Sequence, residues 1–562
     1  MSTQASQRVR WPINADMAAI ALIVLSLTAG LGMRQPSPPD EPRFVLAART
    51  MIETGQWLIP HRGIELYAEK PPVFMWIQAL SYQLIGNWEV AFLLPSLIAA
   101  LITLALVYDM GRRLWNPVIG RHAVLCLFAT VQFGLMAKRA QIDMVLVAMT
   151  TASLWGMVRH LFQGGSRKAL VLAGFMAGLG TVTKGVGFLP LLMLVPYLII
   201  RRRVTSPSLT RLGVGGMAAL LVGFGLGTAL WLGPLGYELL RHPSPELQRY
   251  AGELLFEQTG TRYAAAWHHV QPWWYFVQVI ATLWLPGALL LPFLVRLWWQ
   301  DFKRLDAKVV LLVGWCLLVL LFFSASPGKR EVYILPALPA LSMAAGPYVM
   351  RLIERRICGQ LLLVYLLLLL ICAGSAAAGL LTDQPWWSRT LEGRGVMHGS
   401  QHALGMWLAA LAVGLVAILS WTGRRRIAEA IVVSTAFMWF CYGVGFMPTL
   451  DPYASASFLM QRVEARLAPG DQLALIDWRE QNYLQAERSI TEFGFKAPVD
   501  EQKRRVAKWL ADGADRKFLL IPEESAKDCV HVNDAMRIGQ ANRVTWLLVP
   551  ASAAQGLCQL EQ

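Results

Sequence analysis

The sequence predicts an all-α polytopic membrane protein that carries a small α/β domain at its C-terminal end. Of its 562 residues, 55% are hydrophobic and only 15% are charged, and apolar runs of membrane-spanning length recur from about residue 17 to about residue 447. From about Asp451 the composition changes to that of a soluble domain. We therefore expect a membrane domain over residues 1–450 and an α/β domain over residues 451–562.

The positions of Lys and Arg set the expected topology, because loops rich in these residues stay on the cytoplasmic side. Two crossings must join each pair of successive basic clusters, which gives thirteen spans with the N-terminus inside and the C-terminus outside. The net charge of +15 has the same origin and is not evidence of nucleic-acid binding. The expected spans are 18–33, 89–110, 120–137, 143–160, 169–183, 185–200, 213–233, 273–296, 308–323, 332–350, 360–381, 404–421 and 427–447.

Two apolar segments near the N-terminus need separate interpretation. The first, Ala18 to Met33, lacks a convincing small-residue cleavage site, so it is interpreted as a signal anchor and as the first span. The second, Val73 to Ile85, is short for a hydrocarbon core that needs about 20 helical residues. Counting it as a crossing would also place Arg112 and Arg113 outside. We therefore expect an interfacial or re-entrant helix there.

The ionisable residues gather in outer segments of the predicted topology, chiefly the loops 34–88 and 234–272 and the shorter segments 138–142 and 324–331. A basic group kept at the outer boundary needs an anionic partner. That partner is either a carboxylate of the same cluster or a lipid headgroup, or it is the phosphate of a bound ligand. The acidic and basic residues expected on this outer face include Asp40, Glu41, Arg43, Glu69, Lys70, Lys138, Arg139, Asp143, Lys184, Arg262, Lys329, Arg330 and Glu331.

The C-terminal region has the pattern of a small α/β domain. Apolar stretches at Leu473–Ile476, Phe518–Ile521 and Val544–Val549 predict short strands, and Asp500–Leu510 is amphipathic. If this region faces an oxidising compartment, its two cysteines, Cys529 and Cys558, either form a disulfide or stay free, because the sequence gives no distance between them.

Common catalytic and nucleotide-binding motifs are missing from the sequence. It contains no HExxH, no CxxC pair, no Walker loop and no GxGxxG in a βαβ context. Gly174, Gly178 and Gly180 lie within an expected span, the first two at GxxxG spacing, and indicate close packing of helices.

Five motifs, in this order along the chain, resemble those of a known superfamily. They are Asp-Glu-x-Arg at 40–43, Tyr-x-Glu-Lys-Pro at 67–71, Thr-Lys-Gly at 183–185, Pro-Trp-Trp-Tyr at 272–275 and Ser-x-Gly-Lys-x-x-x-Tyr-Ile-Leu-Pro at 326–336. The pattern resembles the C-type (GT-C), polyprenyl-phosphate-dependent membrane glycosyltransferases, which are related to the protein O-mannosyltransferases. Within them it is most similar to the bacterial 4-amino-4-deoxy-L-arabinose lipid A transferases.

The resemblance implies a pentosyltransferase of the bacterial inner membrane, with its active site and C-terminal domain in the periplasm. The donor would be an undecaprenyl-phosphate aminosugar and the acceptor a phosphate of lipid A, which would give resistance to polymyxin and other cationic peptides. Membrane lipids would surround a monomer, and no nucleic acid would bind. No cofactor is required with certainty, but a divalent ion, Zn²⁺ or Mg²⁺, is implied at Glu69 and His269.

The same resemblance assigns roles to individual residues. Asp40 matches the catalytic carboxylate and Asp143 a second functional carboxylate. The positions that match the phosphate and headgroup pocket of the donor are Arg43, Tyr67, Lys70, Arg262, Lys329 and Tyr333. Against a phosphate acceptor, which is already largely ionised, Asp40 would orient the reactants. Against a hydroxyl acceptor it would have to take a proton.

Structural interpretations of these residues stay open. Asp40 and Glu41 are also typical of a helix cap, Glu69 and Lys70 of a surface ion pair, and Asp143 of the first turn of a helix. Adjacent histidines such as His268 and His269 are typical of a membrane interface as well.

Two other functions remain as alternatives: a glycosyltransferase with a protein or glycan hydroxyl acceptor, and a lipid flippase or transporter. A transporter usually shows repeats and ionisable residues near the bilayer midplane.

Overall fold

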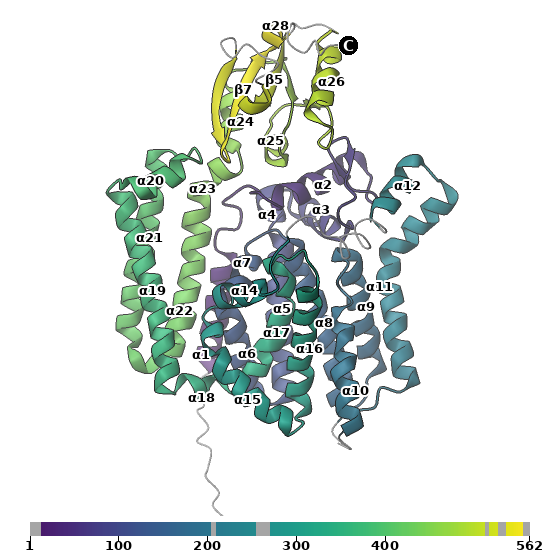
Figure 1. Cartoon of the computed structure of the whole chain (residues 1–562), viewed down its shortest axis with the longest axis vertical. Helices are drawn as coiled ribbons and strands as arrows, with labels where there is room; N and C mark the ends of the chain where they lie inside the picture. Colours follow the sequence, from purple (N-terminus) through teal and green to yellow (C-terminus); the bar gives the residue numbers. More distant parts are fainter. Residues whose placement is uncertain (1–12, 204–208, 255–269, 512–515, 527–534, 555–562) are drawn as a thin grey trace, which may run out of the picture.

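The computed structural model describes residues 13–203, 209–254, 270–511, 516–526 and 535–554. A large bundle of helices occupies one end of the molecule and a small α/β domain the other, with α2, α3 and α4 between them (Figure 1). In chain order, the elements of the helical part are α1 Ile13–Thr28, α2 Glu41–Thr54, β1 His61–Arg62, β2 Glu65–Leu66, α3 Val73–Ile85, α4 Trp88–Ala91, α5 Leu94–Leu114, α6 Pro117–Ala129, α7 Val131–Ala137, α8 Ile142–Phe162, α9 Arg167–Lys184, η1 Leu189–Met193, α10 Leu194–Arg203, α11 Val214–Arg241, α12 Pro245–Gly252, α14 Tyr275–Leu283, η3 Gly287–Leu290, α15 Leu291–Lys303, α16 Ala307–Ala325, η4 Glu331–Ile334, α17 Ala337–Ala345, α18 Val349–Ile353, α19 Arg356–Leu381, α20 Pro385–Glu392, α21 His398–Thr422, η5 Arg424–Arg426, α22 Ile427–Cys441, η6 Tyr442–Phe446 and α23 Met447–Ala454.

The helical bundle makes the chain a multi-pass membrane protein, but the predicted count of thirteen spans is not confirmed. Among the described residues, seven helices are long and apolar enough to cross a membrane, and two bent helix pairs raise the number to nine at most. The shorter apolar helices include Val73–Ile85, which has the bounds that the sequence predicted for an interfacial or re-entrant helix. Its position relative to the membrane stays a prediction.

Two predicted spans are sharply bent, and their bends contact each other. Helices α6 and α7 meet at 74°, and α14 meets the segment Gly287–Lys303 at 109°. Pro286 lies at the second bend, where it cannot donate to the helical hydrogen-bond ladder. The carbonyl of Leu285, at the same bend, accepts a hydrogen bond from Val131 N at 3.0 Å, and Trp284 Nε1 donates to Gln132 Oε1 at 2.7 Å. A third predicted span, 332–350, is divided among η4, α17 and α18.

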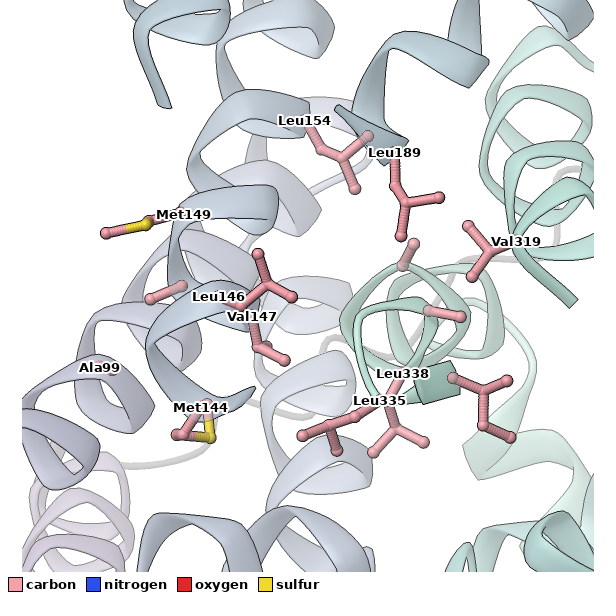
Figure 2. Packing of buried hydrophobic residues seen from close by; sticks show 14 of the residues in the cluster. Ala99, Met144, Leu146, Val147, Met149, Leu154, Leu189, Val319, Leu335 and Leu338 are labelled. Atoms are coloured by element: carbon pink, nitrogen blue, oxygen red, sulfur yellow. The ribbon is translucent and has the colours of Figure 1, made fainter. Parts of the chain in front are cut away.

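The helix that begins at Ile142 is held in the centre of the bundle. Its buried side chains include Met144, Leu146, Val147 and Leu154, which belong to one large apolar cluster. Figure 2 shows them beside residues of neighbouring elements such as Leu338 of α17. Because protein interiors are close-packed, this environment leaves α8 little freedom to shift. The carboxylate of Asp143, in its first turn, therefore has a fixed position.

The glycines of α9 pack against α11, as the GxxxG spacing predicted. A Cβ atom on Gly174 would lie 1.9 Å from Leu220 O, and one on Gly178 would lie 2.3 Å from Phe224 O. The contact is reciprocal, because Gly223 of α11 approaches Val171 O of α9 in the same way, at 2.1 Å. Small residues thus let the two backbones touch over two turns.

The C-terminal region is an α/β domain, as predicted. Its five strands form one sheet in the order β4-β3-β5-β7-β6, in which β3 is parallel to β4 and β5 while β7 is antiparallel to β5 and β6. The prediction found the three central strands and missed the two at the edges, whose burial is less regular. The elements are α24 Ser457–Glu464, β3 Gln472–Leu475, α25 Glu480–Leu484, β4 Ile490–Glu492, α26 Val499–Ala511, β5 Lys517–Pro522, α27 Glu523–Ala526, β6 Met536–Ala541, β7 Val544–Pro550 and α28 Ala551–Ala554.

Helix α2 joins the two parts of the molecule. Leu46, which is fully buried, belongs to the apolar cluster of the C-terminal domain together with Leu473 and Trp546. Phe44 and Met51 of the same helix belong instead to the cluster of the helical bundle. The helix that follows Asp40 is therefore packed on two sides.

Helix α23 crosses the expected domain boundary at residue 450, and the next helix, α24, already packs on the sheet.

Candidate active site

Asp40 lies at the N-terminus of α2 and is paired with an arginine from a distant loop. Arg330 Nη2 donates to Asp40 Oδ2 at 2.8 Å, and Gln141 Nε2 donates to the same oxygen at 3.4 Å. Although Asp40 occupies the cap position of α2, its side chain makes no capping hydrogen bond. Burial alone would raise the pKa of Asp40, but Arg330, with help from Arg43 and Lys184, holds it below its usual value. The carboxylate is therefore ionised at neutral pH.

Arg43, one turn further along α2, faces three carboxylates. Its guanidinium lies 3.1 Å from Glu480, 3.4 Å from Glu69 and 4.0 Å from Asp40. Glu480 belongs to α25, so the C-terminal domain contributes a charged residue to this site. Arg43 is thus neutralised within the protein, and it would have to exchange a carboxylate for a phosphate to bind a donor directly.

Arg62 is a buried member of the same cluster. Its Nη1 donates to Glu480 at 3.0 Å, its Nη2 lies 3.9 Å from Glu69, and its side chain is only 3% exposed. The guanidinium stacks 3.6 Å from the ring centroid of Phe495 and 5.6 Å from that of Tyr67. Tyr67 is itself buried, and this burial raises the pKa of its hydroxyl, so it is a neutral hydrogen-bond donor at physiological pH.

Asp143 and Tyr333 meet through Lys184. The Lys184 Nζ donates to Asp143 Oδ1, and both side chains are nearly buried, at 10% and 8% exposed. The same Nζ lies 5.1 Å from the centre of the Tyr333 ring. The charges of Asp40 and Asp143 both raise the pKa of Arg330, so the two carboxylates stabilise the same guanidinium cation.

The loop that carries Lys329 and Arg330 is tied to the segment before Trp273. Val270 and Gly328 form an antiparallel bridge, and Gln271 N donates to Pro327 O at 3.2 Å. The buried Lys329 donates from its Nζ to Gln271 O at 3.1 Å. This pairing fixes the loop so that Arg330 reaches Asp40.

Glu41 differs from its neighbour Asp40 in every contact. It accepts two hydrogen bonds from Arg34, at 2.6 and 2.7 Å, and a third from Ala140 N at 2.8 Å. Arg34 also donates to Lys138 O at 3.0 Å. Glu41 therefore binds the start of α2 to the segment that leads into α8, which is a structural role.

The structure brings most of the predicted site residues together. Asp40, Arg43, Tyr67 and Glu69 form one network, which extends through Arg330 and Lys184 to Asp143 and Tyr333. Lys329 precedes Arg330 in the chain, but its side chain binds the carbonyl of Gln271 instead. Lys70 follows Glu69 directly and is half-buried in the bend that precedes α3. Arg262, Tyr263, His268 and His269 lie outside the described residues, as do Cys529 and Cys558.

The implied metal site is only half described. Glu69 would be one ligand, but its carboxylate faces Arg43 and Arg62, which compete with a cation for it. His269, the other ligand, lies outside the described residues. The described residues around Glu69 therefore do not form a metal site.

Four members of the network were not among the predicted site residues. Lys184 and Arg330 belong to the ionisable residues expected on the outer face, so their charge could have identified them as site residues. Glu480 had no signal, because it lies in the soluble domain and 437 positions from Arg43 in the chain. Arg62 is likewise recognisable only from its burial against Phe495.

The fold and the site define a class of protein. The family profile described as dolichyl-phosphate-mannose-protein mannosyltransferase matches residues 69–224. The structure aligns with ArnT from Cupriavidus metallidurans bound to undecaprenyl phosphate, with a TM-score of 0.75 and 20% identity, over 97% of this chain and 99% of that one. The apo form gives 0.74 and 19%, over 96% and 99%. The fold is therefore that of the GT-C glycosyltransferase ArnT, which confirms the predicted fold class.

Sequence similarity points to particular relatives. The undecaprenyl phosphate-alpha-4-amino-4-deoxy-L-arabinose arabinosyl transferase of Pseudomonas aeruginosa PAO1 is 32% identical over 323 residues, which cover 55% of this chain and 54% of the relative. A transferase of the same name, numbered 1, from Pseudomonas fluorescens Pf-5 is 29% identical over 344 residues, covering 60% and 59%. The chain thus spans a little over half the length of the curated relatives that it matches. The resemblance stated from the motifs is confirmed.

Proposed function

We propose that this protein transfers 4-amino-4-deoxy-L-arabinose from undecaprenyl phosphate to a phosphate of lipid A. It would act as a monomer at the periplasmic face of the bacterial inner membrane, and it would thereby lower the binding of polymyxin and other cationic peptides. The observation that carries the proposal is the network around Asp40, in a fold shared with a structure that holds undecaprenyl phosphate. Both substrates are lipids and would reach this site from the outer leaflet.

The reaction needs electrostatic support more than acid or base. The bond between the sugar's anomeric carbon and the donor phosphate oxygen breaks, and its electron pair leaves with undecaprenyl phosphate. An oxygen of the acceptor phosphate forms the new bond to the same carbon. Cationic groups that stabilise the departing phosphate therefore lower the barrier. Lys70 and Arg262 are assigned this role by sequence, and Lys184 and Arg330 add positive charge beside the two carboxylates.

The state of Asp40 favours a phosphate acceptor. A general base is most effective when its pKa lies near the working pH. The pKa of Asp40 is instead lowered by Arg330, so its carboxylate is a weak base. A phosphate monoester with a second pKa of about 6 is already largely ionised and needs no base. Asp40 would then orient the reactants, for example through the ammonium group of the aminosugar.

A second candidate function is glycosyl transfer to a protein or glycan hydroxyl. The match of residues 69–224 to the mannosyltransferase family favours it. A hydroxyl acceptor must lose a proton, so it would require a base in the site. A lipid flippase or transporter is less consistent with the structure, because the described charge cluster lies at the end of the bundle next to the C-terminal domain (Figure 1).

The proposal is tested in a strain that lacks its own aminoarabinose transferase. Complementation with the wild-type chain should restore an aminopentose on lipid A, measured by mass spectrometry, and survival in polymyxin. Asp40→Asn and Lys70→Ala should abolish both while the protein still reaches the membrane. Glu41→Gln is the matched control: it neutralises the adjacent carboxylate, so its defect should appear as a lower protein level or stability rather than as inactive, well-folded enzyme.

The outcome separates the two candidates. Unmodified lipid A in cells that contain inserted wild-type protein would contradict transfer to lipid A. In that case, sugar-labelled protein or glycan from the same cells would support the hydroxyl acceptor.

A further inference from the structure

Two histidines and one aspartate meet beside α20, on a part of the fold that is separate from the Asp40 network. Asp383 follows the end of α19, and His398 and His402 lie one turn apart at the start of α21. Each offers one ligand atom, and these atoms all lie within 4.8 Å of one another. We propose that Asp383, His398 and His402 form a binding site for a divalent metal ion of the zinc type.

Two of the three distances between ligand atoms suit tetrahedral coordination, and the third is below 4.8 Å. His402 Nε2 lies 2.9 Å from Asp383 Oδ1, and His398 Nδ1 lies 3.5 Å from the same oxygen. Bonds of about 2.0–2.1 Å around a tetrahedral zinc ion place neighbouring ligand atoms about 3.3 Å apart. Both distances lie within a few tenths of an ångström of that value. Small side-chain rotations are therefore enough to admit the ion.

The ligand set selects the kind of metal. Two imidazoles and one carboxylate suit Zn²⁺ and its transition-metal neighbours, whereas Ca²⁺ and Mg²⁺ prefer oxygen ligands alone. Asp383 and His398 are exposed and His402 is partly exposed, so water has access to the fourth position. The positive end of the α21 helix dipole opposes a cation at this place, and the negative charge of Asp383 offsets it.

The backbone holds the three ligands near one another. His398 and His402 are four residues apart, so they share one face of α21, and their rings lie 4.3 Å apart between centroids. Asp383 adopts a left-handed conformation with φ of 54°, which Asp tolerates better than most residues. This conformation ends α19 and turns the chain toward α20. A bound ion would link the end of α19 directly to the start of α21.

The link would fix a segment that faces the C-terminal domain. The ligands enclose residues 384–397, and a Cβ on Gly395 in that segment would lie 2.9 Å from Gln540 O of β6. Met397 lines a cavity of about 320 Å³ together with Leu459 of α24 and Gln540. We infer a structural role for the metal, in which it stiffens the contact between the outer end of the bundle and the sheet.

The test uses the full chain in detergent or lipid nanodiscs, with an affinity tag that contains no histidine. Zn²⁺ binding is measured by titration calorimetry and metal analysis, and Co²⁺ is used as a spectroscopic probe of tetrahedral coordination. The wild type should bind one Zn²⁺ ion at this site. The variants Asp383→Asn and His402→Ala should bind Zn²⁺ at least tenfold more weakly than the wild type does. Zn²⁺ should raise the melting temperature of the wild type and leave that of His398→Ala/His402→Ala unchanged.

Two controls separate this site from others. His242→Ala removes an exposed histidine that also pairs with a carboxylate one turn away, Glu238. Among the described residues His242 has no third ligand beside it, so this variant should still bind the ion. Glu69→Gln removes the ligand implied near the active site and should also keep it. Equal Zn²⁺ binding by the wild type and the His398/His402 double variant would overturn the proposal. So would loss of the ion in Glu69→Gln alone.

Discussion

Glu480 and Arg43 connect the C-terminal domain to the helix that begins at Asp40. Glu480 Oε1 accepts a hydrogen bond from Arg43 Nε at 3.1 Å and another from Arg62 Nη1 at 3.0 Å. The Glu480 side chain is only 8% exposed, so this contact is poorly screened by water. The domain thus reaches the network around Asp40 through the Glu480 carboxylate and through the ring of Phe495, on which Arg62 stacks.

Replacing Glu480 with Gln should reduce transfer activity while leaving the C-terminal domain folded. The change keeps the shape of the side chain but removes the charge that balances Arg43 and Arg62. Breaking a buried ion pair costs up to about 3–5 kcal/mol, and part of that loss should appear as a displaced Arg43 and a lower rate. Glu501→Gln, an exposed residue of α26, is the control and should retain full activity. The measurement is lipid A modification at equal membrane levels of protein. Unchanged activity in Glu480→Gln would show that the domain does not influence the site through this contact.

Replacing Arg330 with Met should make activity depend on pH in the weakly acidic range. In the wild type Arg330 holds the pKa of Asp40 below the usual value of a carboxyl group. The charge of Asp40, and the stability gained from its pairing, are therefore lost only as pH falls through that lowered pKa. Without Arg330, only Arg43 and Lys184 oppose the effect of burial, so the pKa of Asp40 rises. The acid limb of the pH–rate profile should therefore move to higher pH. Arg330→Lys keeps the positive charge and should leave the pH–rate profile near that of the wild type. Identical profiles for the Arg330→Met and Arg330→Lys variants would argue against the pairing of Arg330 with Asp40.

Asp143 and Lys184 should show strong coupling in a double-mutant cycle. Each single neutralisation, Asp143→Asn or Lys184→Met, leaves a nearly buried charge without its partner, which costs about 3–5 kcal/mol of stability. The double variant should cost clearly less than the sum of the two. The exposed pair of Arg112 and Asp109 is the comparison, and its coupling should not exceed about 1 kcal/mol. Additive effects at Asp143 and Lys184 in unfolding experiments would contradict the observed pair.

Gly223→Val should destabilise the bundle, whereas Gly225→Val in the same helix should not. A Cβ on Gly223 would lie 2.1 Å from Val171 O, a backbone atom, so α9 and α11 would have to separate. Overpacking of this kind costs about 1–3 kcal/mol. Gly225 has no atom within 4 Å of the corresponding position. Thermal unfolding in detergent compares the two variants, and equal melting temperatures would disprove close packing of the helices at Gly223.

The sequence predicted local features well and interrupted helices poorly. The bounds of Val73–Ile85, the three central strands and the close packing at Gly174 are confirmed, because hydropathy and residue size report on them directly. The bends near Thr130 and Pro286 were missed. Both segments are mostly apolar. The hydrogen bonds that join the two bends, from Val131 N to Leu285 O and from Trp284 Nε1 to Gln132 Oε1, link positions that are far apart in the chain, so no local sequence pattern reveals them.

The sequence by itself determined the class of fold and the region of the site. Apolar segments of sufficient length form membrane helices, so hydropathy predicts the fold class. Charged groups are costly within a bilayer, so the few outer segments that contain most of the ionisable residues indicated the position of the active site. Only the tertiary structure decided which charges pair. Asp40 and Arg330 are 290 positions apart, and Arg43 and Glu480 are 437 apart. Ionic contacts depend on distance in space and have no sequence period, so adjacent carboxylates such as Asp40 and Glu41 acquire different roles only when the chain has folded.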